Sequence, residues 1–171
     1  VTVTPPSYTG LAPAAQADNR GHVDALYGSE VRLAADCSKK IAGAAAVFKN
    51  RKPLTLNVNG SYASGSFRVT GDDEYTIHLR DSSRVENLDP ITYTVSSHAD
   101  RPPAVRMLAP AQLTDLDETM KIEMEAELID DFGISRAALA YSVLKNGIPD
   151  STTREWNLYE LQKYIKSGAV Q

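Results

Sequence analysis

Hydrophobic and polar residues alternate with a period of two along most of the chain. The clearest run in the first half is GSEVRLAADC, in which Val31, Leu33, Ala35 and Cys37 fall on one face. Shorter alternating runs follow, separated by turn residues, at 54–58, 67–69, 75–79 and 91–95. This pattern is typical of half-buried antiparallel strands. About seven such strands, without a long helical pattern, predict an all-β sandwich.

One segment of the first half allows two interpretations. Residues 41–48 (IAGAAAVF) are rich in alanine, which is compatible with a helix. The presence of Gly43, the shortness of the run and the strand patterns that follow favour a strand.

The stretch from Lys121 to Val143 has the same alternation and is expected to form a strand, a tight turn and a second strand. In the first strand Ile122 to Leu128 places aliphatic residues inward and glutamates outward. The turn is predicted at Asp130-Asp131-Phe132-Gly133, where Gly133 supplies a positive φ and Phe132 packs beneath.

A polar segment, Ser96 to Pro103 (SSHADRPP), separates the two alternating regions and is typical of a semi-rigid linker. We therefore expect two domains, residues 1–98 and 99–171. Aligning Ile41 with Ile134 matches the inward positions of the following strands, which indicates a tandem repeat. The second copy is too short to hold all the strands of the first, so it is predicted to be incomplete, with an open edge and an apolar face that need a cover.

The last segment departs from the alternation. Asn157 can cap a helix and Glu160 follows three positions later, while Leu158, Leu161 and Ile165 share one helical face. These signals predict a short C-terminal helix near 158–167; a coil without partner strands is the alternative.

Composition narrows the class of protein. With 171 residues, 42% hydrophobic and 23% charged, the chain resembles ordinary globular proteins. The net charge of −4 argues against a nucleic-acid partner, which requires a concentrated basic face. No apolar run reaches the roughly 18 residues of a membrane span. Cys37 is the only cysteine, so an internal disulfide and an all-cysteine metal site are excluded, and a buried apolar role is expected for it.

Few residues point to chemistry. Asp131-Phe132-Gly133 matches the metal-binding tripeptide of protein kinases, but the other kinase motifs are missing. His22, His78 and His98 have no metal-ligand spacing and no matching nucleophile. No enzyme activity and no cofactor are therefore predicted. The acidic residues most suited to a calcium site are Asp115, Asp117, Glu118, Asp130 and Asp131, with solvated acidic turns as the alternative.

Two stretches resemble immunoglobulin-like domains: GSEVRL, similar to the start of strand B, and Asp72 to Ile77 (DDEYTI), similar to strand F. The resemblance implies that Tyr75 forms the hydrogen bond of the tyrosine corner. It also implies that Ile77 replaces the usual strand-F cysteine and faces Ala35 or Cys37, so that packing replaces the disulfide.

Further segments resemble tandem immunoglobulin-like repeats of large bacterial, membrane-anchored extracytoplasmic proteins of unassigned function. They are Pro5 to Gly10, Asp89 to Val95, Pro102 to Val105 and Ala126 to Ser135. The resemblance implies an extracytoplasmic location, in the periplasm or cell envelope, and a membrane association only through other segments of a larger protein.

The expected function is that of a non-enzymatic spacer or protein-interaction module, which pairs with a protein partner or with the remainder of its own chain. The alternative is a carbohydrate- or peptidoglycan-binding module that uses exposed aromatic residues, namely Tyr27, Tyr62, Trp156 and Tyr159.

Overall fold

The computed structural model describes the backbone of residues 1–17, 20–149 and 154–170, and the side chains of these residues up to Glu155, apart from Lys145 and Pro149. Two compact units divide the chain, Val1–Asp100 (unit 1) and Arg101–Gln171 (unit 2). The protein is all-β: the described residues form strands and one short 3-10 helix, η1 (Ser7–Thr9).

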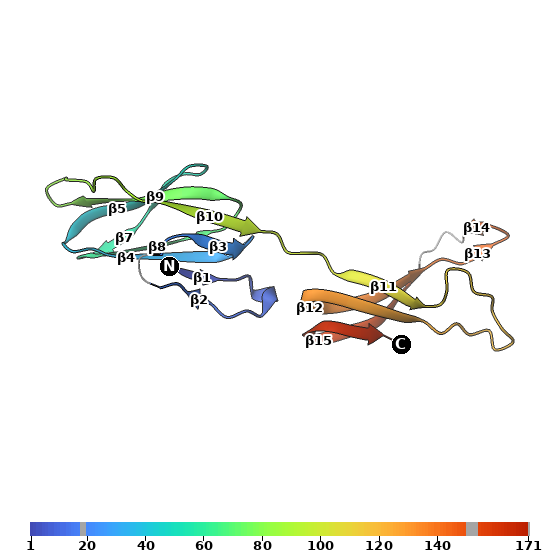
Figure 1. Ribbon diagram of the computed structural model, residues 1–171. Coiled ribbons are helices and arrows are strands. Elements are labelled where there is room, and N and C mark those ends of the chain that lie inside the picture. Colours follow the sequence, from blue (N-terminus) through green and yellow to red (C-terminus); the bar gives the residue numbers. More distant parts are fainter. Residues whose placement is uncertain (18–19, 150–153, 171) are drawn as a thin grey trace. The chain divides into compact units, whose positions relative to one another are not determined.

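Unit 1 contains two five-stranded sheets that pack face to face (Figure 1). The first sheet has the order β2-β1-β4-β8-β7 and the second the order β3-β10-β9-β5-β6. The strands of the first sheet are β1 (Thr2–Thr4), β2 (Ala14–Ala15), β4 (Glu30–Asp36), β7 (Asn57–Asn59) and β8 (Tyr62–Arg68). Those of the second are β3 (Val23–Leu26), β5 (Ile41–Phe48), β6 (Leu54–Thr55), β9 (Asp73–Asp81) and β10 (Thr92–His98). The alanine-rich segment 41–48 is thus a strand, as predicted, and β10 extends into the predicted linker.

The core of unit 1 lies between the two sheets. The first sheet contributes Val31 and Leu33, and the second contributes Phe48, Tyr75 and Val95 to the same cluster of buried side chains. Each large side chain of this kind contributes roughly 1.5–3 kcal/mol through the burial of apolar surface. The inward face that the period-two pattern predicts for β4 is therefore confirmed, because Val31 and Leu33 lie in a core shared with the opposite sheet.

A second, smaller cluster closes one end of the core. It joins Ile41 and Ala44 of β5 to Leu56 and Ala63, with Cys37 and Ile77 packed against it. Leu56 lies between β6 and β7, where the chain passes from one sheet to the other. This crossing brings Leu56 within 2.6 Å of the position that a Cβ atom on Gly65 would occupy, so any other residue at 65 would require the Leu56 side chain to move.

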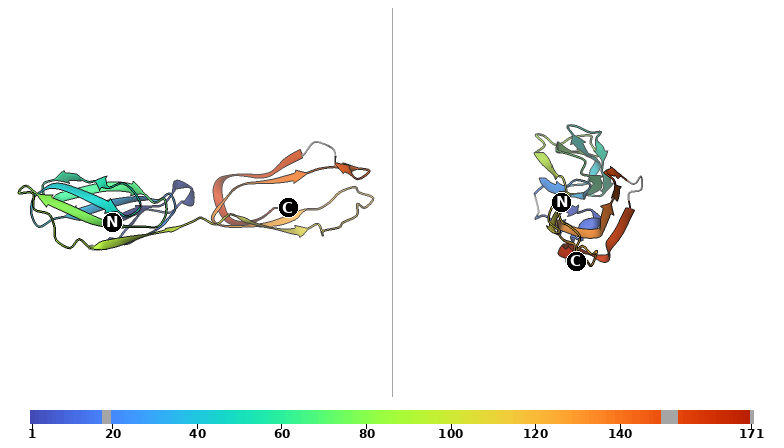
Figure 2. Two further views of the ribbon diagram at one scale, coloured as in Figure 1. Left: turned by 90° about the horizontal axis from the view of Figure 1, so that it is seen from above. Right: turned by 90° about the vertical axis from the view of Figure 1, so that its right-hand side faces the viewer.

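Unit 2 is built on a pair of long strands. β12 (Glu125–Tyr141) pairs antiparallel with β15 (Arg154–Val170) on one side and with β11 (Ala104–Ala109) on the other, and a hairpin of β13 (Leu144–Lys145) and β14 (Ile148–Pro149) lies between them in sequence. Figure 2 shows β12 and β15 bending together, so that their two halves lie in different layers of the unit. The turn between β13 and β14 is Asn146-Gly147, both at positive φ, which is the conformation that an Asn-Gly pair favours in a two-residue hairpin turn.

The predicted turn at Asp130–Gly133 is wrong, because the chain does not reverse there. Ile129 pairs with Ser167 and Ile134 pairs with Ile165, so residues 130–133 bulge out of a strand that continues in the same direction. The Asp130 carboxylate accepts hydrogen bonds from the backbone N–H groups of Phe132 (3.1 Å) and Gly133 (2.7 Å) and closes the bulge. The first predicted strand also begins later than expected, at Glu125.

Within this bulge only Gly133 has a positive φ, of 107°, a conformation that residues with a Cβ atom rarely adopt. We expect Gly133→Ala to reduce the free energy of unfolding of unit 2 by about 1–2 kcal/mol. Urea unfolding followed by the fluorescence of Trp156, the only tryptophan, measures it. Ser135→Ala, at an exposed position of the same strand, is the control and should change the unfolding free energy by less than about 0.5 kcal/mol. Equal stability of the two variants would contradict this role for Gly133.

The predicted C-terminal helix at 158–167 is also wrong, since β15 covers that whole segment. Its backbone pairs with β12 from Arg154 to Val170. Helix-capping signals contribute only about 1 kcal/mol each, whereas antiparallel pairing with β12 provides backbone hydrogen-bond partners along most of this 17-residue strand. The tertiary pairing therefore overrides the local preference.

The two segments aligned as a repeat follow different courses. In unit 1 they are β4 and β5, which belong to different sheets, and the four residues Cys37–Lys40 connect them. In unit 2 they are the two halves of the single bulged strand β12. The alternation of side chains is common to both units, but the chain reverses between sheets in one and only bends in the other.

Candidate functional site

The five calcium candidates are not gathered into one site. Asp115, Asp117 and Glu118 lie in the loop between β11 and β12, and Asp130 and Asp131 lie in the β12 bulge. Across the ranges that the structure describes, no three His, Cys, Asp or Glu side chains are placed to share a metal ion. Two of the five accept local hydrogen bonds instead: Asp117 accepts from the hydroxyl and the N–H of Thr119, which lower its pKa, and Asp130 closes the bulge.

The three histidines lie in unit 1, His22 just before β3, His78 in β9 and His98 at the end of β10, and each has a different polar partner. His22 Nδ1 accepts the backbone N–H of Thr94 at 3.1 Å, and His98 contacts Asp24. His78 Nε2 is 3.0 Å from the hydroxyl of Thr76, two positions earlier on β9. Residues two positions apart on a strand share a face, so this contact joins neighbouring side chains of one strand.

Cys37 is a free, half-buried thiol that packs against the smaller core cluster with Ile77. Burial, and then the negative charge of Asp36, raise the pKa of the thiol. A thiol held in its protonated form is a poor nucleophile. Cys37 and Ile77 thus contribute apolar packing, in the region where the resemblance to immunoglobulin-like domains implies that packing replaces a disulfide.

Tyr75 lies at the centre of the unit 1 core and is 1% exposed. Its hydroxyl donates a hydrogen bond to the backbone carbonyl of Gly21 at 2.5 Å, 54 residues earlier in the chain. A tyrosine corner instead bonds to backbone a few residues upstream, so the hydrogen bond differs from the one that the resemblance implies. It ties β9 to the loop before β3, where the Tyr93 ring leaves no room for a Cβ atom on Gly21.

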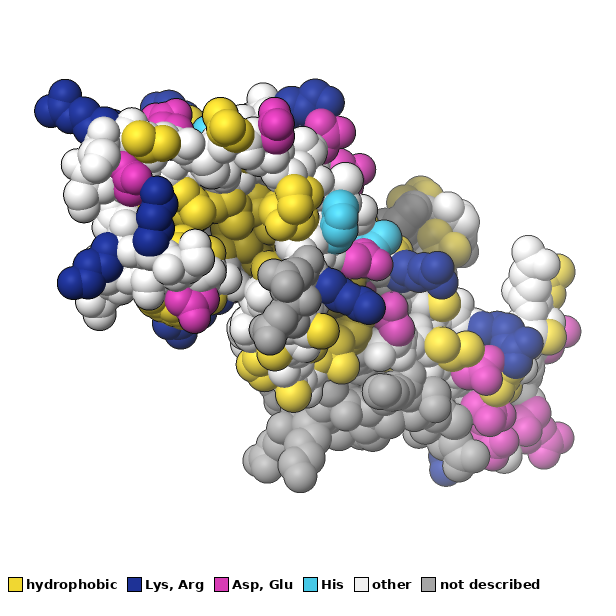
Figure 3. Space-filling view, turned by 60° about the vertical axis from the view of Figure 1, so that its left-hand side comes forward, with side chains coloured by type: hydrophobic (Ala, Val, Ile, Leu, Met, Phe, Trp, Pro, Cys, Tyr) yellow, Lys and Arg dark blue, Asp and Glu magenta, His cyan; other side chains and the backbone are white. Residues whose placement is uncertain are grey.

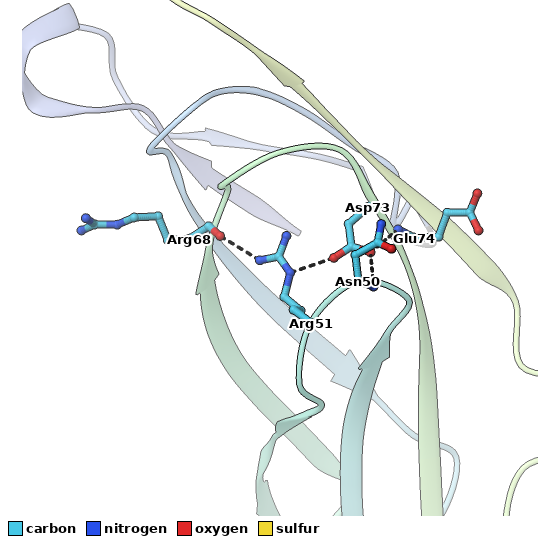
Figure 4. A network of polar contacts seen from close by, with 5 residues as sticks. All are labelled: Asn50, Arg51, Arg68, Asp73 and Glu74. Atoms are coloured by element: carbon cyan, nitrogen blue, oxygen red, sulfur yellow. Dashed lines mark hydrogen bonds and ion pairs between the residues drawn. The ribbon is translucent and has the colours of Figure 1, made fainter.

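A polar network that the sequence analysis missed closes the other end of the core (Figure 4). The Asp73 carboxylate, at the start of β9, is 2.8 Å from Arg51 Nε and accepts the backbone N–H groups of Asn50 (3.0 Å) and Glu74 (2.9 Å). Arg51 Nη1 also donates to the carbonyl of Arg68 at 2.9 Å.

The same network is packed against the aromatic core. The guanidinium carbon of Arg51 lies 4.7 Å from the ring centre of Phe48 and 5.2 Å from that of Phe67, which belong to opposite sheets. Through these cation–π contacts, Arg51 connects a strand of one sheet to a strand of the other. The sequence contains one indication of this network: Asp73 lies two residues before the inward-facing Tyr75, so its carboxylate is on the same inward face of the strand.

The exposed tyrosines do not form a shared sugar platform. Tyr27, 58% exposed, precedes β4, and Tyr62 pairs with Asp36 at the other end of the same strand. At about 3.3 Å per residue the two ends of β4, Glu30 and Asp36, lie roughly 20 Å apart, so the two tyrosines belong to opposite ends of this strand. The other two aromatic candidates, Trp156 and Tyr159, have side chains outside the described residues.

The strand edges of the two units differ in length. Unit 1 ends its sheets with β2, β3, β6 and β7, which have two, four, two and three residues. In unit 2 both outer strands, β11 with six residues and β15 with 17, pair only with β12 among the described strands. Short edge strands are a usual protection against unwanted pairing, so unit 1 is protected in a way that β11 is not.

The side chains of β11 leave an apolar surface beside this edge. Directly opposite residues of an antiparallel pair share a face, so Val105 shares a face with Leu128, and Met107 with Ala126. Leu128 is buried, at 8% exposed, whereas Val105 is 66% and Met107 49% exposed. The inner face of the sheet thus continues over β11 without a cover, and β11 is the candidate functional site.

The charged side chains form no basic patch on the face of unit 1 that Figure 3 shows, where Lys and Arg are scattered among Asp and Glu. Within the described part of the chain, no helix is long and apolar enough to cross a membrane.

The described residues define an all-β fold in which β11 has a free edge, and no three of their His, Cys, Asp or Glu side chains are placed to hold a metal ion. No model of a known protein family matches the chain, and no curated protein compared with it is similar in sequence.

Proposed function

We propose that unit 1 is an immunoglobulin-like domain. Its sheet orders support this assignment: β1-β4-β8-β7 corresponds to strands A, B, E and D, and β5-β9-β10 corresponds to C, F and G. The packing of Tyr75 and Ile77 in the core is compatible with strand F.

We further propose that the protein is a non-enzymatic interaction module that binds a protein partner by strand addition to β11. In strand addition, backbone hydrogen bonds to a free sheet edge provide affinity and alternate side chains provide specificity. The observation that carries the proposal is that the free edge of β11 is six residues long, where unit 1 has edges of two to four, and has the exposed apolar side chains of Val105 and Met107 beside it.

The location and the parent protein are proposed from the sequence resemblance alone. By that resemblance, the chain belongs to the cell envelope, outside the cytoplasm, as part of a larger membrane-anchored protein. A module of this kind needs no cofactor and no nucleic acid, and its partner is either another protein or another part of the same protein.

Site-specific photo-crosslinking tests strand addition. A photoreactive amino acid in place of Val105 or Met107 is expected to give a discrete protein adduct in a cell-envelope fraction, because both side chains lie beside the free edge. Val85 and Leu88 of unit 1, which are 60% and 90% exposed, are the matched control positions. Adducts of equal yield from all four positions, or none from 105 and 107, would reject β11 as the binding edge.

A further inference from the structure

The centre of β11 carries a charge that a partner strand must meet. Arg106 pairs with Glu127 of β12 in the antiparallel register, and its Nη2 atom lies 2.8 Å from Glu127 Oε2. Both side chains are on the face opposite Val105 and Met107, and the Arg106 side chain is 70% exposed. A strand added to the free edge of β11 places one residue directly beside Arg106 on this face.

We infer that β11 selects a partner strand with an acidic residue between two apolar residues, an inference that rests on the strand addition proposed above. Cross-strand neighbours of opposite charge stabilise a sheet, and like charges destabilise it. A guanidinium group has five N–H donors, so Arg106 can bind a second carboxylate while it keeps Glu127. A lysine or arginine at the same position would face Arg106 at close range.

The other face of the sheet determines which residues suit the two partner positions that flank the acidic residue. The residues on either side of the acidic one lie beside Val105 and Met107, and apolar side chains there extend the inner face that Leu128 already occupies. Pro103 and Pro110 flank β11, and a proline has no N–H to donate, so strand addition is confined to residues 104–109.

β12 supplies a template for this pattern. Its residues Ala126-Glu127-Leu128 have the order apolar, acidic, apolar, and β11 already pairs with them on its other edge. The predicted partner therefore resembles β12 in the three residues that lie opposite Val105, Arg106 and Met107.

A peptide series with the sequence of residues 121–129 tests the inference on the full chain. All peptides carry Gln at the positions of Glu123 and Glu125, and they differ only at the position of Glu127, which is Glu, Gln or Lys. Binding is followed by the amide shifts of residues 104–109 in nitrogen-15 spectra at low salt. We expect the Glu peptide to bind about fivefold more tightly than the Lys peptide, with Gln between them.

Variants of Arg106 separate charge selection from strand addition. Arg106→Gln should remove the preference among the peptides, whereas Arg106→Lys should keep most of it. Equal binding of all three peptides to the unaltered chain would overturn the charge selection and leave strand addition standing. Failure of every peptide to shift residues 104–109 would overturn both.

Discussion

Asp73→Ala is expected to destabilise unit 1 more than any other substitution of a charged residue in it, by about 3 kcal/mol. The Asp73 side chain is only 2% exposed and accepts hydrogen bonds from Arg51 and from two backbone N–H groups. Its removal leaves the guanidinium of Arg51, itself 24% exposed, without a counter-ion above the aromatic core. Urea unfolding followed by the near-ultraviolet circular dichroism of the tyrosines measures the loss.

Asp72→Ala is the matched control for this prediction. Asp72 precedes Asp73 and accepts one hydrogen bond, from the N–H of Ser97 at 2.8 Å, in an exposed position. Its replacement should cost less than about 1 kcal/mol. A loss of similar size in both variants would show that the buried ion pair of Asp73 adds nothing beyond a single surface hydrogen bond.

The same carboxylate should make the stability of unit 1 depend on pH. Burial alone would raise the pKa of Asp73, but the hydrogen bonds from Arg51, Glu74 and Asn50 and the charge of Arg51 together lower it. A lowered folded-state pKa contributes stability that is present above the unfolded-state value of about 3.9 and is lost as the pH falls through the folded-state value. In Asp73→Asn this part of the acid sensitivity should be absent.

Tyr75→Ala is expected to reduce the unfolding free energy of unit 1 by about 4 kcal/mol, because it opens a cavity at the centre of the core. The ring of Tyr75 packs against Phe48, Phe67 and Tyr93, at centre-to-centre distances of 5.4–6.2 Å. Tyr75→Phe keeps this packing and removes only the hydroxyl, which leaves the Gly21 carbonyl unpaired and should cost about 1–2 kcal/mol. The same unfolding experiment measures both variants.

Tyr62→Ala, at a position that is 40% exposed, is the control for the ring and should cost well under the loss in Tyr75→Ala. The hydroxyl has its own signature in alkaline solution. Burial, and then Tyr93, raise the pKa of Tyr75 far above its usual value near 10. The folded state therefore holds this proton more tightly, and stability is lost as the pH rises above about 10. If Tyr75→Phe shows the same alkaline loss as the unaltered chain, the buried hydroxyl is not its source.

These two residues also show how far the sequence predicts the core. The alternation around Tyr75 places it inward, and the structure has it buried. Its hydrogen-bond partner was not predictable, because Gly21 lies in a stretch without periodicity and meets Tyr75 only when the loop before β3 lies against β9. Asp73 is a similar case. The sequence pattern places its side chain inward, but its hydrogen-bond donors, Asn50 and Arg51, lie in the loop between β5 and β6.

The candidate site, too, was predicted only in part from the sequence. The sequence predicted that the second unit would be short of strands and would leave an edge open, but not which edge. Only the strand order shows that β11 lies at a sheet edge, and only its register with β12 shows that Arg106 is its central charge. The side chains of Val105 and Met107 are apolar in the sequence, yet their exposure depends on the absence of a covering layer above them among the described residues.

The sequence by itself determined the all-β class, the inward faces of β4 and β9 and the Asn146-Gly147 turn, because period-two alternation and turn chemistry act over a few neighbouring residues. Only the tertiary structure decided the bulge at 130–133 and the strand at 154–170, where local signals predicted a turn and a helix. β12 and β15 hold each other extended, because each provides hydrogen-bond partners for the backbone of the other. The free energy gained from this pairing exceeds the small free energies of local turn and capping preferences.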